Sequence, residues 1–231
     1  MPAFKEFKDS PTLVAALAGQ VAELLRDGIR ARGQASLVVS GGSTPVPFFA
    51  ALSELALDWT QVTITLADER WVDPSEAGSN EHLVRQHLLQ NRAAMARFVG
   101  LKTGAVTAVQ GEKECADRLA LLPRPFDALI LGMGNDGHTA SLFPQAARLG
   151  EALALESGKL CLAITPPAAP HERMTLTLPT LLHSRQIILH IVGVDKRAVY
   201  ERAMADGPVA QMPIRAVLGQ TALPVTVFWC P

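Results

Sequence analysis

The sequence is poor in cysteine, and the three cysteines that it has, Cys115, Cys161 and Cys230, lie far apart. An odd number at such spacing does not fit a disulfide framework, and no C-x-x-C pair or H-E-x-x-H motif indicates a metal centre. We therefore expect free thiols, a reducing compartment and no catalytic metal.

The sequence also lacks an excess of charge of either sign. Its 21 lysines and arginines balance 22 aspartates and glutamates, and the net charge is −1. This distribution provides no basic surface for nucleic acid or for an anionic membrane. No apolar run approaches the roughly 18 residues of a membrane-spanning helix, and the charged residues within 1–10 do not fit a signal peptide. The sequence therefore predicts a cytoplasmic protein with neither a nucleic-acid nor a membrane partner.

The sequence does contain a regular alternation of apolar strands and amphipathic helices. Hydrophobic residues fill 48% of the 231 positions, which is enough for a sizeable core. The patterns predict helices over 10–33, 80–89, 106–122, 194–204 and 213–218, with Ser10 as the first N-cap. They predict strands over 35–39, 62–67, 128–131, 159–165, 174–178, 187–192 and 225–229.

This alternation favours right-handed βαβ crossovers and therefore an α/β fold. We expect a single domain over residues 1–231, with a mainly parallel, doubly wound (Rossmann-like) sheet flanked by helices. Residues 90–104 show no clear pattern, and 146–158 are interpreted as a linker. The sequence does not fix the oligomeric state, and either a monomer or a small homo-oligomer is expected.

The stretch at residues 127–144, DALILGMGNDGHTASLFP, is the most informative in the chain. An apolar strand ends there in three glycines, and Asp136 and His138 lie inside the glycine turn. Glycine allows the backbone to approach a ligand closely, and open α/β sheets bind ligands at such strand ends. A plain glycine turn, with Asp136 as a helix cap, is the alternative at this point.

The same glycines match the dinucleotide motif G-x-G-x-x-G, but two features argue against a nicotinamide cofactor. Pro144 stops any helix too soon after the loop to face a pyrophosphate. The next predicted strand, 159–165, ends without an acid for a ribose hydroxyl. We therefore predict no cofactor.

A second glycine turn, SGGSTP at 40–45, follows the strand at 35–39 and precedes a helix. Small residues with free backbone N–H groups in this position form a nest that suits an anion. The spacing differs from that of a nucleotide P-loop, so the turn is interpreted as a phosphate site rather than a nucleotide site. A simple glycine turn is again the alternative.

Charged residues follow several of the other strands. Asp68 and Arg70 come directly after the strand at 62–67, Arg173 precedes the strand at 174–178, and Lys196 follows the strand at 187–192. If the sheet is parallel, these side chains collect at one edge, although each could instead be a solvated surface residue. Cations, carboxylates and one imidazole beside an anion nest suit acid–base chemistry on a small phosphorylated substrate. Covalent acyl transfer has little support, because the sequence has no G-x-S-x-G elbow.

Five segments together resemble one known family. They are VVSGGSTP (38–45), TLADERWVD (65–73), SNEHLVRQHLL (79–89), GMGNDGHTASLFP (132–144) and HERMTLTLP (171–179). The combination is similar to the lactonase branch of the glucosamine-6-phosphate isomerase/6-phosphogluconolactonase superfamily. The resemblance covers most of the chain and implies an α/β sheet with one dominant domain. It also implies metal-free hydrolysis of 6-phosphoglucono-δ-lactone to 6-phosphogluconate in the oxidative pentose phosphate pathway.

One departure separates the two branches of the superfamily. The isomerase/deaminase branch continues after D-G-H to an acid followed by proline, whereas here Phe143 precedes Pro144. A lactonase needs only one group to act in turn as base and acid, so the missing carboxylate favours the lactonase over the isomerase. A non-catalytic sugar-phosphate-binding regulator is a further alternative. Such regulators usually carry an added helix-turn-helix segment, for which we expect no room before Ser10.

The residue types and the resemblance suggest catalytic roles. His138 would take a proton from water and return it to the ring oxygen, because histidine titrates near neutral pH. Asp136 would orient the imidazole or bind a substrate hydroxyl. The sequence leaves open whether its carboxylate reaches the imidazole ring. Arg70 would stabilise the oxyanion or a substrate hydroxyl. Asp68 matches the proton-transfer acid of the isomerase branch, and is expected to pair with Arg70 or to hold a hydroxyl.

The predicted phosphate site combines the nest with two cations. The backbone N–H groups of Gly41, Gly42 and Ser43 would bind the phosphate, and Thr44, Arg173 and Lys196 would close around it. The expected ligand is thus a small sugar-phosphate lactone.

Overall fold

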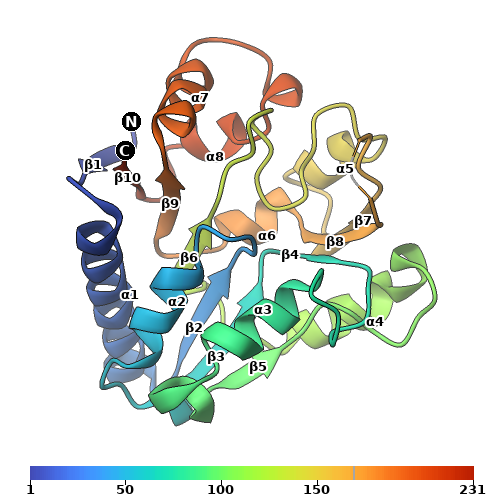
Figure 1. Ribbon diagram of the computed structural model, residues 1–231. Helices are drawn as coiled ribbons and strands as arrows, with labels where there is room; N and C mark the ends of the chain where they lie inside the picture. The colour runs from blue at the N-terminus through green and yellow to red at the C-terminus, as the bar shows by residue number, and fades with distance from the viewer. Residues whose placement is uncertain (169) are drawn as a thin grey trace.

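The central sheet of the computed structural model, which describes residues 1–168 and 170–231, is entirely parallel (Figure 1). Within the described residues it has seven strands, in the order β1-β10-β9-β6-β2-β3-β5. Their bounds are β1 Ala3–Glu6, β2 Ala35–Val39, β3 Val62–Leu66, β5 Arg97–Val99, β6 Ala128–Leu131, β9 Ile187–Val192 and β10 Val225–Cys230. The first and last strands pair with each other, so the two chain ends lie side by side.

The strand order changes direction at the middle of this sheet. From β2 the chain proceeds outward through β3 to β5, whereas from its other neighbour, β6, it proceeds through β9 to β10. Every residue of β2 and β6 is buried, as expected for parallel strands covered on both faces. Ligands bind in open α/β sheets at such a reversal, beyond the carboxyl ends of the strands. Both predicted glycine turns start there.

Helices flank the sheet as predicted (Figure 1). They are α1 Ser10–Arg32, α2 Val46–Ser53, α3 Asn80–His87, α4 Ala108–Ala120, α5 Leu149–Leu153, α6 Leu178–Leu182, α7 Val194–Met204 and α8 Arg215–Leu218. The predicted cap of α1 is displaced by one residue, because Asp9 rather than Ser10 accepts the Thr12 N–H, at 2.9 Å. Gly33 ends this helix at φ +71°, a left-handed conformation that favours glycine.

Two predicted strands lie outside the parallel sheet. β7 (Cys161–Ile164) and β8 (Arg173–Leu176) form a separate antiparallel sheet, in which β8 also pairs with β4 (Asp68–Arg70). The expectation of a mainly parallel sheet is confirmed, but the sequence did not indicate that these two strands pair outside it. The reason for their antiparallel pairing is their short connection, since a parallel pair requires a crossover of a dozen or more residues, usually a helix. The charged stretch 68–70, for which the sequence predicted no strand, is an edge strand.

Four other elements escaped sequence prediction, among them α6, whose first residue, Leu178, was expected to end the strand at 174–178. β1 is exposed at all four residues, so it has no buried face to produce an apolar pattern. β5 falls within the weak stretch 90–104, and α5 within the expected linker. No helix of the described residues has the length and apolar character that crossing a bilayer requires.

Candidate active site

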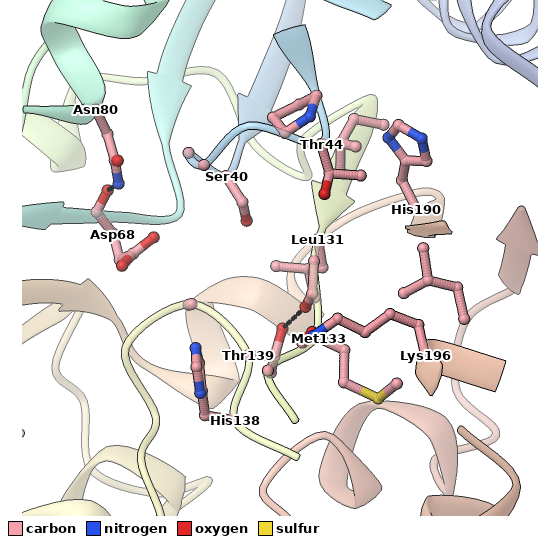
Figure 2. A pocket seen from close by; sticks show the side chains of 18 of the residues that line it. Ser40, Thr44, Asp68, Asn80, Leu131, Met133, His138, Thr139, His190 and Lys196 are labelled. Atoms are coloured by element: carbon pink, nitrogen blue, oxygen red, sulfur yellow. Dashed lines mark hydrogen bonds between the residues drawn. The ribbon is translucent and has the colours of Figure 1, made fainter. Parts of the chain in front are cut away.

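A cavity of about 340 Å³ opens beyond the carboxyl ends of β2, β6 and β9 (Figure 2). Eight of the predicted site residues line it: Gly41, Gly42, Thr44, Asp68, Arg70, His138, Arg173 and Lys196. The other two, Ser43 and Asp136, are not among the described residues that line the cavity. Ser43 lies between Gly42 and Thr44 in the sequence, and Asp136 is hydrogen-bonded to His138. Segments far apart in the sequence therefore meet at one place. The two glycine turns and Lys196 follow parallel strands, as predicted, whereas the antiparallel strands β4 and β8 supply the other three charged residues.

Asp136 and His138 form a hydrogen-bonded pair within the turn that follows β6. The imidazole Nδ1 lies 2.6 Å from Asp136 Oδ1, and the His138 backbone N–H donates to the same oxygen at 3.1 Å. Burial raises the pKa of Asp136, but the backbone and imidazole N–H groups of His138 outweigh it and hold this pKa below its usual value. An Nδ1–H that donates to the carboxylate leaves Nε2 as the free acceptor. This geometry suits a general base.

The surroundings of the imidazole restrict its position. The ring packs against Phe143, with centroids 4.4 Å apart. Gly137 adopts φ +79° and allows the chain to double back between Asp136 and His138. A Cβ at Gly134 would lie 2.1 Å from His138 Nδ1, so only glycine leaves room for the ring at this position.

The turn at residues 40–45 has the character of an anion nest. The Ser40 N–H donates to Ile130 O at 3.1 Å, which ties the turn to β6, and Gly42 adopts φ +96°. The N–H groups of residues 41–44 donate to no acceptor within the described part of the chain. Gly41 packs so closely on Asn80 that a Cβ would lie 1.9 Å from its Oδ1. Four free donors in one turn are suited to phosphate oxygens.

Asp68 and Arg70 do not form the ion pair expected as one alternative. Asp68 Oδ2 accepts the Ser141 hydroxyl at 2.6 Å, while Arg70 Nη1 donates to the Gly78 carbonyl at 2.6 Å. No Asp68–Arg70 bridge occurs among the described residues, because each side chain has a different partner close by. Both residues line the cavity and keep polar atoms for a ligand.

Arg173 and Lys196 both bring positive charge to the cavity. Arg173 is 6% exposed, pairs in register with Arg70 across β4 and β8, and has an Nη1 without a partner among the described residues. Burial lowers the pKa of Arg173, and the nearby Asp68 carboxylate opposes this shift. Lys196 Nζ donates to Met133 O at 2.8 Å and Asn135 Oδ1 at 2.6 Å, so it also holds the histidine loop. Burial lowers the pKa of Lys196 as well.

Comparison with known proteins agrees with this architecture. Residues 8–229 match the family model described as glucosamine-6-phosphate isomerases/6-phosphogluconolactonase. The chain belongs to this family. The 6-phosphogluconolactonase of Pseudomonas putida is 45% identical over 226 residues (98% of this chain, 92% of the relative), and that of Mesorhizobium japonicum is 47% identical over 225 residues (97% and 94%). A crystal structure of a 6-phosphogluconolactonase from Shewanella baltica has a TM-score of 0.98 at 51% identity, covering 100% of this chain and 98% of that one.

Both branches of the glucosamine-6-phosphate isomerase/6-phosphogluconolactonase family share this fold. A monomeric glucosamine-6-phosphate deaminase has a TM-score of 0.80 to this chain at 17% identity, a likeness that concerns the fold alone. The architecture therefore does not separate the lactonase from the deaminase branch. The two reactions must be distinguished by individual residues of the cavity. Phe143, which packs on the His138 imidazole, is one candidate.

Two buried residues at or beside the cavity were not identified from the sequence. Ser141 is fully buried and orients Asp68, but a serine in a loop carries no pattern that indicates such a role. His190 lines the cavity from β9 and is 4% exposed, with both ring nitrogens unpartnered among the described residues. One polar residue within the apolar run at 187–192 was the available signal. Burial lowers the pKa of His190 to about 4, so the ring is neutral at physiological pH.

We expect His190 to make the folded state sensitive to acid. Its pKa is about 4 in the folded chain and near 6.5 when unfolded, so the unfolded chain binds the extra proton between these values. The contribution of His190 to the free energy of unfolding is fully present above pH 6.5. It decreases by about 3 kcal/mol as the pH falls toward 4. Urea unfolding of the wild type and of His190→Leu at several pH values measures the difference. Equal pH slopes in the two proteins would refute the assignment.

Proposed function

We propose that this chain hydrolyses 6-phosphoglucono-δ-lactone to 6-phosphogluconate, the lactonase step of the oxidative pentose phosphate pathway. The 6-phosphogluconolactonases named above, at 45–51% identity over nearly their full length, support a lactone hydrolase of this type. The observation that carries the reaction is His138, which is hydrogen-bonded to Asp136 and lines the same cavity as a turn with four free N–H donors. A base and an anion site in one cavity fit a substrate that carries both a reactive carbonyl and a phosphate.

His138 acts as the base and then as the acid. Nε2 takes a proton from water as the water oxygen attacks the lactone carbonyl, and the carbonyl electron pair moves to oxygen. The tetrahedral intermediate then collapses, the ring C–O bond breaks, and Nε2 returns the proton to the departing ring oxygen. Asp136 keeps the second imidazole proton on Nδ1 and stabilises the charged ring between the two steps. The net change is the addition of one water.

The remaining polar groups bind charge and hydroxyls. Arg70, on the cavity wall, stabilises the oxyanion of the intermediate or an adjacent hydroxyl. Asp68, oriented by Ser141, accepts a sugar hydroxyl. The phosphate lies on the N–H groups of Gly41, Gly42 and Ser43, with Thr44 beside them and Arg173 and Lys196 supplying positive charge.

Several expectations from the sequence extend this proposal. The whole chain, 1–231, acts as one catalytic domain in the cytoplasm, as a monomer or small homo-oligomer. It needs no cofactor and no nucleic-acid or membrane partner. Catalysis needs no metal, since the base, its orienting acid and the oxyanion donors all come from side chains.

The decisive assay is proton release after addition of freshly generated 6-phosphoglucono-δ-lactone, compared with spontaneous hydrolysis. We expect acceleration that is unchanged by excess chelator. Acceleration abolished by the chelator would refute the metal-free mechanism. No acceleration by the folded protein would refute the lactonase assignment, and ammonia release from glucosamine 6-phosphate would then assign the chain to the deaminase branch.

A further inference from the structure

Glu69 is a fully buried carboxylate that has no part in the mechanism described above. It lies on β4 between Asp68 and Arg70, and its side chain is 0% exposed. Four groups donate to it: Arg70 N at 2.8 Å, Ser79 Oγ at 3.0 Å, Asn80 N at 2.7 Å and Glu81 N at 2.7 Å. The carboxylate thus joins β4 to the start of α3.

The chemistry of these contacts fits an ionised side chain. Three of the four partners are backbone N–H groups that can only donate, so a protonated Glu69 could donate only to the Ser79 hydroxyl, which already accepts the His82 N–H. Burial raises the pKa of Glu69, and the hydrogen bonds from α3, Ser79 and Arg70 oppose the rise. The positive end of an eight-residue helix favours the anion further. Glu69 accepts the first two N–H groups of α3, and Ser79 accepts the third, from His82, at 3.1 Å, so the two side chains together hold the start of this helix.

The turn that Glu69 holds reaches back to the cavity. Gly78, next to Ser79, accepts the guanidinium of Arg70 at 2.6 Å, and Asn80 Nδ2 donates to the backbone carbonyl of Asp68 at 2.9 Å. The backbone of Arg70 is therefore fixed by Glu69 directly, and its guanidinium through the same turn. A shift of residues 78–80 would move the charged end of Arg70 along the cavity wall.

We propose that Glu69 is a positioning residue for the reaction, which fixes the Arg70 guanidinium through the turn at residues 78–80. The inference rests on the proposed function, because it concerns a step in which Arg70 stabilises developing charge. Misplacement of such a group by about 1 Å, even by a distant substitution, costs on the order of 100-fold in rate. Glu69 thus controls kcat without touching the substrate.

A double-mutant cycle with Arg70 tests this role. We expect Glu69→Gln, which places an amide against the backbone donors, to lower kcat about 10- to 100-fold with KM changed less than about 3-fold. In an Arg70→Met background the same substitution should lower kcat less than about 2-fold, because residues that act as a unit are not additive. Rates are corrected for spontaneous hydrolysis of the lactone.

Each outcome of the cycle has one meaning. Equal losses in both backgrounds would show that Glu69 does not act through Arg70 and would overturn the proposal. If the wild type hydrolyses the lactone but Arg70→Met is fully active, the proposal also fails, while the lactonase assignment stands. A wild type inactive on the lactone refutes the proposed function itself, and in that case the cycle is not needed.

Two further variants guard against a general effect on folding. Glu81→Gln is the matched control, because Glu81 is a neighbouring buried acid whose carboxylate pairs with Arg85 at 2.8 Å instead. It should keep the wild-type kcat. If Glu69→Gln does not fold, Ser79→Ala removes one of the four donors and should lower kcat in the same Arg70-dependent manner. A loss in Ser79→Ala that persists unchanged in Arg70→Met would contradict the inference.

Discussion

Replacement of His138 by asparagine is expected to lower kcat for 6-phosphoglucono-δ-lactone by about 10²- to 10⁴-fold, the usual contribution of a general base. Asparagine keeps a side chain of similar shape that can still hydrogen-bond to Asp136, but it has no group that can take a proton from water. The measurement is proton release at saturating substrate, with the spontaneous rate subtracted.

The same variant should retain binding of the phosphate. The nest after β2 and the histidine turn after β6 are separate segments, so loss of the imidazole leaves the four N–H donors of residues 41–44 in place. Calorimetric titration with 6-phosphogluconate should give a Kd within about 3-fold of the wild type, a difference below 1 kcal/mol. If His138→Asn loses both turnover and binding, the separation of catalytic and phosphate-binding roles is wrong.

Much of the fold follows from the sequence because its central strands are buried on both faces. β2 and β6 are mostly apolar, are buried at every residue and lead into glycine turns. In a chain whose strands alternate with helices, such segments indicate the central strands of a parallel sheet. β1 and β4 could not be found in this way. β1 is an exposed edge strand, and β4 is three residues of charged sequence held by its pairing with β8. Their structure comes from their partners rather than from their own pattern.

The candidate site was predictable to a similar extent, and for a related reason. Residues that directly follow parallel strands, such as Thr44 and His138, are brought together by topology alone. The partners of those residues depend on side-chain directions that a sequence does not contain. Asp68 therefore lies against Ser141 rather than Arg70, and His190 enters the cavity from within a strand.

Phe143 is the position at which we expect two reactions on one fold to diverge. Its ring packs on the imidazole. By the resemblance given in the sequence analysis, the isomerase/deaminase branch is expected to have an acid at this point. An apolar wall there restricts the imidazole and removes a second proton carrier from its neighbourhood. A hydrolysis that needs a single proton shuttle tolerates this loss, whereas a ring-opening isomerisation does not. On this expectation Phe143 favours the proposed lactonase, whereas the architecture, which both branches share, does not separate the two reactions.

Gly134→Ala is expected to inactivate the site without any change in a catalytic group. The added Cβ would lie 2.1 Å from His138 Nδ1 and 2.6 Å from Asp136 Oδ1, distances at which one of these groups must move. Displacement of the base by about 1 Å costs on the order of 100-fold in rate, and we expect a loss of kcat at least that large. Gly132→Ala is the control from the same turn, since a Cβ there has no described heavy atom within 4 Å. If both variants lose activity equally, the loss comes from a general disturbance of the turn and not from the contact of the new Cβ with the imidazole. A selective loss in Gly134→Ala would show that the Asp136–His138 geometry itself carries catalysis.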